Sequence, residues 1–416
     1  MPASGNSRLA GRIVFSYPDF TFYQLARFFI VLATEMQSVA VGWQVYDITK
    51  RPLDLGLVGL AQFLPGILLF LVSGHAADRY DRRKVLMLGY AGFAVCSGLL
   101  LGITEWRTHH SIYPIYVVMV LVGVVRSFTA PASRAILPLL VPEEHFQSAV
   151  AWGASIFQTA TILGPALGGL IYAFFRGPAT VYSMAMAAAA GAAATMLRVQ
   201  LRSKPRQREH VTWKAALAGL RYIWSHKLIL GSISLDLFAV LLGGAVALLP
   251  VYAREVLQTG PWGLGLLRCA PGIGAGAMAL LLAHRPLRGR AGPTMLWCVA
   301  GFGLFTILFG VSHSLVLSMV ALIFVGASDM VSVVIRGVLV QIETPDEMRG
   351  RVNAVDMIFI GASNELGQFE SGVTAHWLGA VPAVVLGGLG TLIVTAIWAW
   401  SFPELRKADQ LTLVDR

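Results

Sequence analysis

Residues 74–86 read GHAADRYDRRKVL, and this short charged stretch separates two long apolar runs. Six of the seven residues from Asp78 to Lys84 are charged, whereas residues 54–77 and 85–104 contain almost no charge. An apolar run of about 20 residues is long enough to cross the hydrocarbon core of a bilayer as an α-helix. The pattern therefore predicts two membrane-spanning helices joined by a tight, highly charged loop.

The same alternation of apolar runs and short polar loops continues along the whole chain. Of its 416 residues, 56% are hydrophobic and only 13% are charged, and the mean hydropathy is +0.68. A soluble domain carries about 25% charged residues, so this composition favours a polytopic α-helical membrane protein. We expect twelve spans, with approximate cores at residues 21–46, 54–77, 85–104, 113–140, 147–175, 179–197, 228–253, 263–283, 294–312, 315–341, 352–378 and 382–402.

Lys and Arg residues concentrate in every second loop between these spans. The basic loops lie around residues 79–84, 198–208, 285–290 and 349–351, and the formal net charge of the chain is +10. Cytoplasmic loops of membrane proteins are enriched in Lys and Arg, so we expect these loops and both termini to face the cytoplasm. Because the basic residues lie between apolar runs, we expect no nucleic-acid partner.

Other sequence features set limits on the chemistry of the chain. Cys96, Cys269 and Cys298 fall inside expected spans, without the spacing of a disulfide framework or a metal site. The N-terminal stretch is polar and basic without an apolar core, so we expect no cleavable signal peptide. No G-x-x-x-x-G-K-[ST] phosphate loop is present, which argues against built-in ATP hydrolysis.

The two halves of the chain resemble each other. Residues 142–144 (PEE) match residues 345–347 (PDE) at an offset of 203, and Gly164 matches Gly367 at the same offset. Parallel duplication of a six-span unit is a recurrent transporter design. We therefore expect an N-terminal six-helix bundle at residues 1–197 and a C-terminal six-helix bundle at residues 228–402. A cytoplasmic linker with an amphipathic helix should join them at residues 198–227, and a cytoplasmic tail should follow at residues 403–416.

The charged loop carries a resemblance to a known family. Its residues Gly74, Asp78, Arg79, Arg82 and Arg83 resemble the major facilitator superfamily signature G-x-x-x-D-R-x-G-R-[RK], with Asp81 in place of the second glycine. The DRYDRR and TPDEMRGRVNAV segments are similar to the branch of enterobactin exporters and macrolide efflux proteins. The resemblance implies an all-α integral membrane fold with two pseudo-symmetric six-helix bundles, in a bacterial plasma or inner membrane.

The resemblance also implies a gating role for the charged loop. In the family, the aspartate of this signature lies at the cytoplasmic seam between the halves, beside the start of span 11. Here Arg349 and Arg351 lie where span 11 begins, and a helix N-terminus stabilises a carboxylate. We expect Asp78, together with Arg82, to latch the outward-open state there. The alternative is that the cluster serves only to anchor the topology.

Ionisable residues inside the expected spans are candidates for proton coupling, because charges in the hydrocarbon are costly. Glu35 in span 1 and Arg126 in span 4 can pair within the N-terminal half, either as a proton site or as a static ion pair. Asp329 in span 10 stands at the repeat position of Arg126. We expect either a direct role of Asp329 in binding substrate or protons, or local pairing of Asp329 with Arg336. Span 11 also contains the ionisable residues Asp356 and Glu370. The candidates for proton coupling and for the cavity are Glu35, Arg126, Asp236, Asp329, Arg336 and Glu365.

Span 5 contains GPALGG at residues 164–169, which resembles the exporter signature G-x-x-x-G-P-x-x-G-G without its first glycine. Pro165 removes a backbone hydrogen bond, and Gly164, Gly168 and Gly169 allow a neighbouring helix to approach closely. The resemblance favours export over import. Close packing alone is the alternative interpretation.

These observations predict a secondary active exporter of a small organic molecule, siderophore or drug-like, that works by alternating access and proton antiport. The expected partners are a small-molecule substrate, protons and the lipid bilayer, and the transporter is expected to be a monomer. Alternatives of the same fold are a lysophospholipid flippase and a divalent metal exporter, and one of another class is a non-transporting receptor or scaffold. We expect no catalytic residues, no cofactor and no bound metal.

Overall fold

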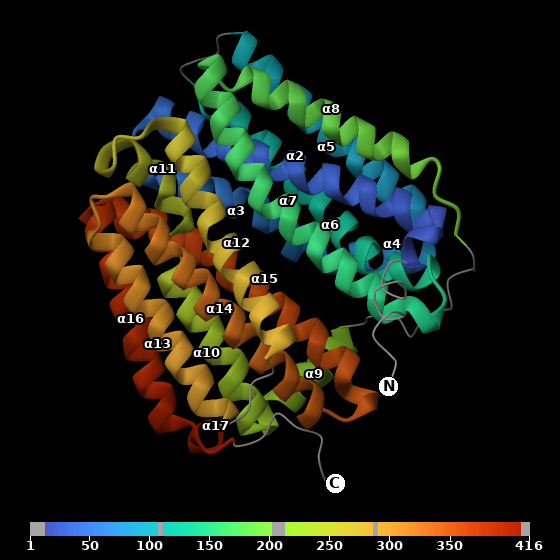
Figure 1. The fold of residues 1–416 in the computed structure, drawn as a ribbon, viewed down its shortest axis with the longest axis vertical. Coiled ribbons are helices and arrows are strands. Elements are labelled where there is room, and N and C mark those ends of the chain that lie inside the picture. Colours follow the sequence, from blue (N-terminus) through green and yellow to red (C-terminus); the bar gives the residue numbers. More distant parts are fainter. Residues whose placement is uncertain (1–12, 107–110, 202–212, 286–289, 409–416) are drawn as a thin grey trace, which may run out of the picture. The chain divides into compact units, whose positions relative to one another are not determined.

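The computed structural model describes residues 13–106, 111–201, 213–285 and 290–408, and within these ranges it is helical without any strand (Figure 1). In this part of the chain, ten helices are long and apolar enough to cross a membrane, and α3 (Pro52–Leu68) is a shorter apolar helix. Each of the twelve expected spans coincides with helical residues. The expectation of an all-α, multi-pass membrane protein is thereby confirmed.

Backbone contacts divide the chain into two compact units. The first comprises Met1–Gln44 and Leu64–Val211, and the second comprises Val45–Phe63 and Thr212–Arg416. We call them the N-terminal unit and the C-terminal unit. The end of α2 (Pro18–Thr49) and most of α3 are grouped with the C-terminal helices.

In the N-terminal unit, α5 packs along both α6 and α8. Pro65 lies inside α3, where it cannot donate the usual helical hydrogen bond, and α3 ends a few residues later. A new helix, α4, begins at Phe70. The remaining elements of this unit are η1 (Ile13–Ser16), α4 (Phe70–Arg79), α5 (Arg82–Glu105), α6 (Tyr113–Ile136), η2 (Leu137–Leu139), η3 (Glu143–His145), α7 (Phe146–Phe175) and α8 (Ala179–Met196).

In the C-terminal unit, α13 packs against α14 and α16, and α12 packs against α14 (Figure 1). The core between these helices and α10 contains the buried side chains of Leu235, Met295, Ile335 and Val394. The elements of this unit are α9 (Trp213–Ser225), α10 (Lys227–Gly243), η4 (Ala245–Leu248), α11 (Leu249–Val251), η5 (Tyr252–Val256), α12 (Gly260–His284), α13 (Ala291–Val311), α14 (Leu315–Glu343), α15 (Asp346–Leu378), α16 (Ala380–Ser401) and α17 (Pro403–Arg406).

The seventh expected span is interrupted. Its first helix, α10, ends at Gly243, and the chain continues through η4 and α11 to a π-helical turn, η5. At the break, the Ser371 hydroxyl of α15 donates a hydrogen bond to the Gly244 carbonyl at 3.1 Å. A Cβ on Gly367 would lie 2.9 Å from the Leu241 carbonyl oxygen, so α15 lies very close to α10 here. Interrupted helices with satisfied backbone groups are typical of transporter binding regions.

Candidate functional site

A buried ion pair lies at the centre of the C-terminal unit. The Arg336 guanidinium of α14 donates a hydrogen bond from Nη1 to Oδ2 of Asp236 on α10, at 2.5 Å. The two side chains are only 4% and 7% exposed, respectively. An ion pair removed from water requires good geometry to offset the desolvation of both charges, and this short contact provides it.

A second carboxylate faces the same guanidinium from a third helix. Oδ1 of Asp356, on α15, lies 3.6 Å from Nη1 of Arg336. This oxygen is buried and has no hydrogen-bond partner. Arg336 is therefore close to acidic partners on both α10 and α15, and it is more tightly bound to the one on α10.

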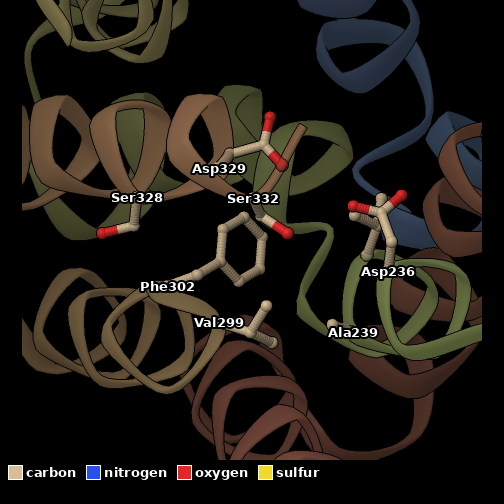
Figure 2. A pocket seen from close by; sticks show the side chains of 8 residues that line it. Asp236, Ala239, Val299, Phe302, Ser328, Asp329 and Ser332 are labelled. Atoms are coloured by element: carbon tan, nitrogen blue, oxygen red, sulfur yellow. The ribbon is translucent and has the colours of Figure 1, made fainter. Parts of the chain in front are cut away.

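A small pocket adjoins Asp236, the acidic member of the ion pair (Figure 2). Its cavity volume is about 10 Å³, and it is lined by Asp236, Ala239, Val240, Val299, Phe302, Ser328, Asp329 and Ser332. Residues 329, 332 and 336 share one face of α14, because they are three and four positions apart. The Ser332 side chain is only 2% exposed, and its hydroxyl oxygen has no hydrogen-bond partner.

Asp329 contributes an unpaired carboxylate to this pocket. Within the described residues, it forms neither an ion pair nor a hydrogen bond. Asp329 does not form the alternative ion pair with Arg336. The two residues are seven positions apart on α14, which corresponds to a rise of about 10.5 Å along the helix. Asp236 and Asp356 thus flank the Arg336 guanidinium, and Asp329 adds a third carboxylate in the adjoining pocket. Uncompensated charge is costly in such a region, so the cluster is suited to binding and releasing protons.

The N-terminal unit holds the other expected charge pair. Glu35 lies on α2 with a half-buried side chain, and Arg126 lies on α6 with an exposed one. The expected pairing of these two residues stays a prediction. Glu35 adjoins the glycine motif of α7, because a Cβ on Gly164 would lie 2.5 Å from the Glu35 Cβ.

The glycine motif forms a close contact between α7 and α2. A Cβ on Gly168 would lie 2.9 Å from the Met36 Cα, and Gly164, Pro165, Gly168 and Gly169 are all buried. Backbone-to-backbone contact of this kind requires residues without side chains. Whether this packing serves export, as the resemblance implies, stays a prediction.

The charged loop is fixed to the ends of neighbouring helices within the N-terminal unit. Arg82 donates a hydrogen bond to the Ala135 carbonyl at 3.1 Å, and Arg83 donates to the Met196 and Leu197 carbonyls at 3.0 and 2.5 Å. Basic side chains stabilise helix C-termini by this contact. Asp81 caps α5 by accepting the Arg83 backbone N–H at 2.9 Å, which accounts for an aspartate where the signature has glycine.

The remaining residues of the loop signature carry no geometric evidence for a gate. Gly74 is half-buried in α4, and Arg79 is exposed at the end of that helix. The side chain of Asp78 lies outside the described part of the structure. Its expected gating role stays a prediction.

The candidates on α15 have local partners. Glu365 accepts a hydrogen bond from the Gln368 side chain at 3.2 Å. Arg349 forms an ion pair with Asp346 at 2.7 Å, and Arg351 donates a weak hydrogen bond to the Met348 sulfur at 3.6 Å. None of these contacts extends to the Asp236–Arg336 pair.

Three residues near the ion pair were not among the candidates for proton coupling. Asp356 is a partner of Arg336, and Ser332 and Phe302 line the pocket. Asp356 stands out in the sequence as a charge within span 11, although its pairing with Arg336 was not expected, and nothing in the sequence distinguishes Ser332 from other serines. The end of α2 also interacts with η5, because Arg254 forms an ion pair with Asp47, and the Tyr46 hydroxyl donates to Glu255.

Known proteins resemble this chain along almost its whole length. A family model described as a transmembrane secretion effector, within the major facilitator superfamily, matches residues 15–415. Enterobactin exporter EntS of Shigella boydii serotype 4 is 29% identical over 407 residues, which cover 95% of this chain and 94% of that protein. Enterobactin exporter EntS of Escherichia coli O139:H28 is 28% identical over the same coverage.

Solved structures share the fold at much lower sequence identity. A mutant of nucleoside transporter NupG matches with a TM-score of 0.72 and 12% identity, covering 93% of this chain and 99% of that one. An inward-facing bacterial homologue of the lysosomal transporter Spinster matches with a TM-score of 0.70 and 11% identity, covering 94% and 97% of the two chains. At these identities, the likeness concerns the fold alone.

Proposed function

The chain belongs to the transmembrane secretion effectors of the major facilitator superfamily, and we propose that it is a secondary active exporter of small organic molecules. The observation that carries this proposal is the likeness to enterobactin exporters along 95% of the chain. The family and the relatives are transporters and not enzymes. Siderophore-like molecules are therefore the first substrate class to test, followed by drug-like amphipathic compounds.

Proton antiport is the energy source that we propose for this export, with entry of protons driving exit of the substrate. The support is the unequal charge of this region of the C-terminal unit, where Asp236 and Asp356 flank the single guanidinium of Arg336 and Asp329 lines the adjoining pocket. A proton on one of them removes a buried negative charge without moving any large group. Asp329 is the strongest candidate for the first proton, because its carboxylate has no ionic or hydrogen-bonded partner among the described residues.

Arg336 supplies the link between protonation and helix movement in this proposal. Its guanidinium lies between Asp236 of α10 and Asp356 of α15, at 2.5 and 3.6 Å. Protonation of Asp236 weakens the first contact, and Arg336 then favours Asp356. The two acidic partners lie on helices that meet at the interrupted seventh span, so a change of partner alters how α10 and α15 pack. Alternating access follows if this change favours one conformation over another.

Transport by purified protein in liposomes tests the proposal. An imposed pH gradient should dissipate when a transported compound is added, and the compound should accumulate against its own gradient. The panel comprises catechol siderophores, macrolides, other amphipathic drugs, lysophospholipids and nickel ions. Movement of lysophospholipid or nickel alone would replace the proposed substrate class by a flippase or a metal exporter. Binding without flux for every compound would reject transport.

We also propose that the chain resides in a bacterial plasma or inner membrane with both termini in the cytoplasm. The support is the concentration of Lys and Arg in alternate loops. Reporter fusions at each terminus and after Arg107 would test this orientation, since the two ends should report the same side and the loop the opposite one.

A further inference from the structure

Helix α9 lies at the entrance to a membrane span. It ends at Ser225, and α10 begins at Lys227, so only one residue separates the two helices. The Tyr222 hydroxyl of α9 donates a hydrogen bond at 2.9 Å to the carbonyl of Glu343, the last residue of α14. Because α9 contacts the beginning of one span and the end of another, it lies at the level of the bilayer surface.

One face of α9 is fixed against α15. A Cβ on Gly219 would lie 2.6 Å from the Arg351 carbonyl oxygen, which brings the two backbones into direct contact. Ile223 is fully buried in a cluster with Val352 and Val355. These contacts orient the helix and leave its opposite face outward.

The outward face of α9 combines apolar and basic groups. Leu217, Arg221 and Trp224 are four and three residues apart, so they share one face of the helix. All three are exposed, Leu217 to 59% and Trp224 to 67%. Trp favours the headgroup level of a bilayer, and an interfacial helix buries its apolar groups just below that level.

We propose that this face of α9 binds anionic phospholipids of the adjoining leaflet. Leu217 and Trp224 enter the boundary between headgroups and acyl chains, and Arg221 contacts a lipid phosphate. A basic side chain at an anionic membrane surface is attracted to it by roughly 1 kcal/mol, which corresponds to about a fivefold change in affinity. This inference does not depend on which molecule the protein exports.

A fluorophore on α9 tests insertion directly. Leu217→Cys is labelled with a polarity-sensitive dye in the Cys298→Ser background, because Cys96 and Cys269 are buried. The full-length protein is reconstituted in phosphatidylcholine vesicles with or without phosphatidylglycerol. We expect blue-shifted emission and quenching by brominated lipids, both stronger when phosphatidylglycerol is present. Emission typical of water in both vesicles, or equal shifts in both, would overturn the proposal.

The role of Arg221 is tested by titrating phosphatidylglycerol into detergent-solubilised protein and following its thermal stabilisation. Arg221→Gln should weaken the apparent affinity about fivefold. The matched control is Arg51→Gln, which removes the same charge from an exposed arginine between α2 and α3. An equal loss in both variants would mean that net charge alone attracts the lipid, and the proposed site on α9 would be wrong.

Discussion

The Arg336 guanidinium of α14 forms a buried ion pair with the Asp236 carboxylate of α10, at 2.5 Å. Asp356 approaches the same nitrogen atom from α15 at 3.6 Å. The arginine thus has one close acidic partner and one more distant one, while each carboxylate depends on the same arginine. This asymmetry makes the effects of substituting the three residues unequal.

Arg336→Gln should destabilise the protein more than Asp236→Asn does. Loss of the guanidinium leaves two buried carboxylates without their positive partner, whereas loss of the Asp236 charge leaves Arg336 beside Asp356. Breaking a buried ion pair by removing one partner costs about 3–5 kcal/mol. We expect Arg336→Gln to approach that range and Asp236→Asn to fall clearly below it, measured as thermal unfolding in detergent.

Arg51→Gln serves as the control for this comparison, because it removes an exposed arginine and should leave the melting temperature almost unchanged. Equal destabilisation by Arg336→Gln and Asp236→Asn would mean that Asp356 offers Arg336 no alternative interaction.

Asp329→Asn should uncouple substrate movement from the pH gradient. The substitution keeps the size of the side chain and removes the only one of the three carboxylates that lacks a direct ionic partner. Efflux driven by a pH gradient should fall to the level of empty vesicles, while downhill exchange of substrate continues and the melting temperature stays the same or rises. Substrate and proton fluxes in liposomes provide the measurement.

A carboxylate outside the pocket provides the comparison for Asp329. Glu347 is exposed at the start of α15, and Glu347→Gln should retain pH-driven efflux. Retention of full coupling by Asp329→Asn would remove Asp329 from the proton pathway and direct attention to Glu35 on α2.

The sequence is sufficient to predict that charges within apolar runs matter, but it does not identify their partners. Asp236, Asp329 and Arg336 all stand out because each interrupts an apolar run. Their pairing depends on how α10, α14 and α15 rotate against each other, and a helical period defines only one helix at a time. Proximity in sequence suggested Asp329 as the partner of Arg336, whereas the structure selects Asp236 from another helix.

The same limit applies to the charged loop and to the interrupted span. The sequence places Arg82 and Arg83 in a short loop, but their contacts with the carbonyls at the ends of α6 and α8 depend on tertiary packing. The break at Gly244 follows an apolar, glycine-containing run that reads as a continuous helix. What stabilises the break is a hydroxyl from Ser371, more than a hundred residues away.

Gly168→Ala should loosen the contact between α2 and α7. The added Cβ would lie 2.9 Å from the Met36 Cα, which is a backbone atom and cannot rotate away. Helix separation removes van der Waals contacts on both sides, and we expect a loss of roughly 1–3 kcal/mol, the usual cost of overpacking. Thermal unfolding of the purified variant measures this loss.

Gly191 on α8 offers the matched substitution for this test, since a Cβ added there would have no neighbouring atom within 4 Å. Gly191→Ala should be neutral or slightly stabilising, because alanine favours the helix. A Gly168→Ala variant as stable as Gly191→Ala would show that the backbones can separate without cost.

The charge of the cluster predicts the proton stoichiometry of transport. Arg336 offsets one of the three carboxylates, which leaves two negative charges between the buried ion pair and the half-buried Asp329 of the adjoining pocket. Because uncompensated buried charge is costly, the resting cluster should hold about two protons and exchange about two per substrate molecule. The ratio follows from the membrane potential at which net flux reverses under fixed gradients of pH and substrate. A ratio near one in the unmodified protein would mean that Asp236 and Asp356 together carry a single negative charge, balanced by Arg336, throughout the cycle. Only Asp329 would then exchange its proton.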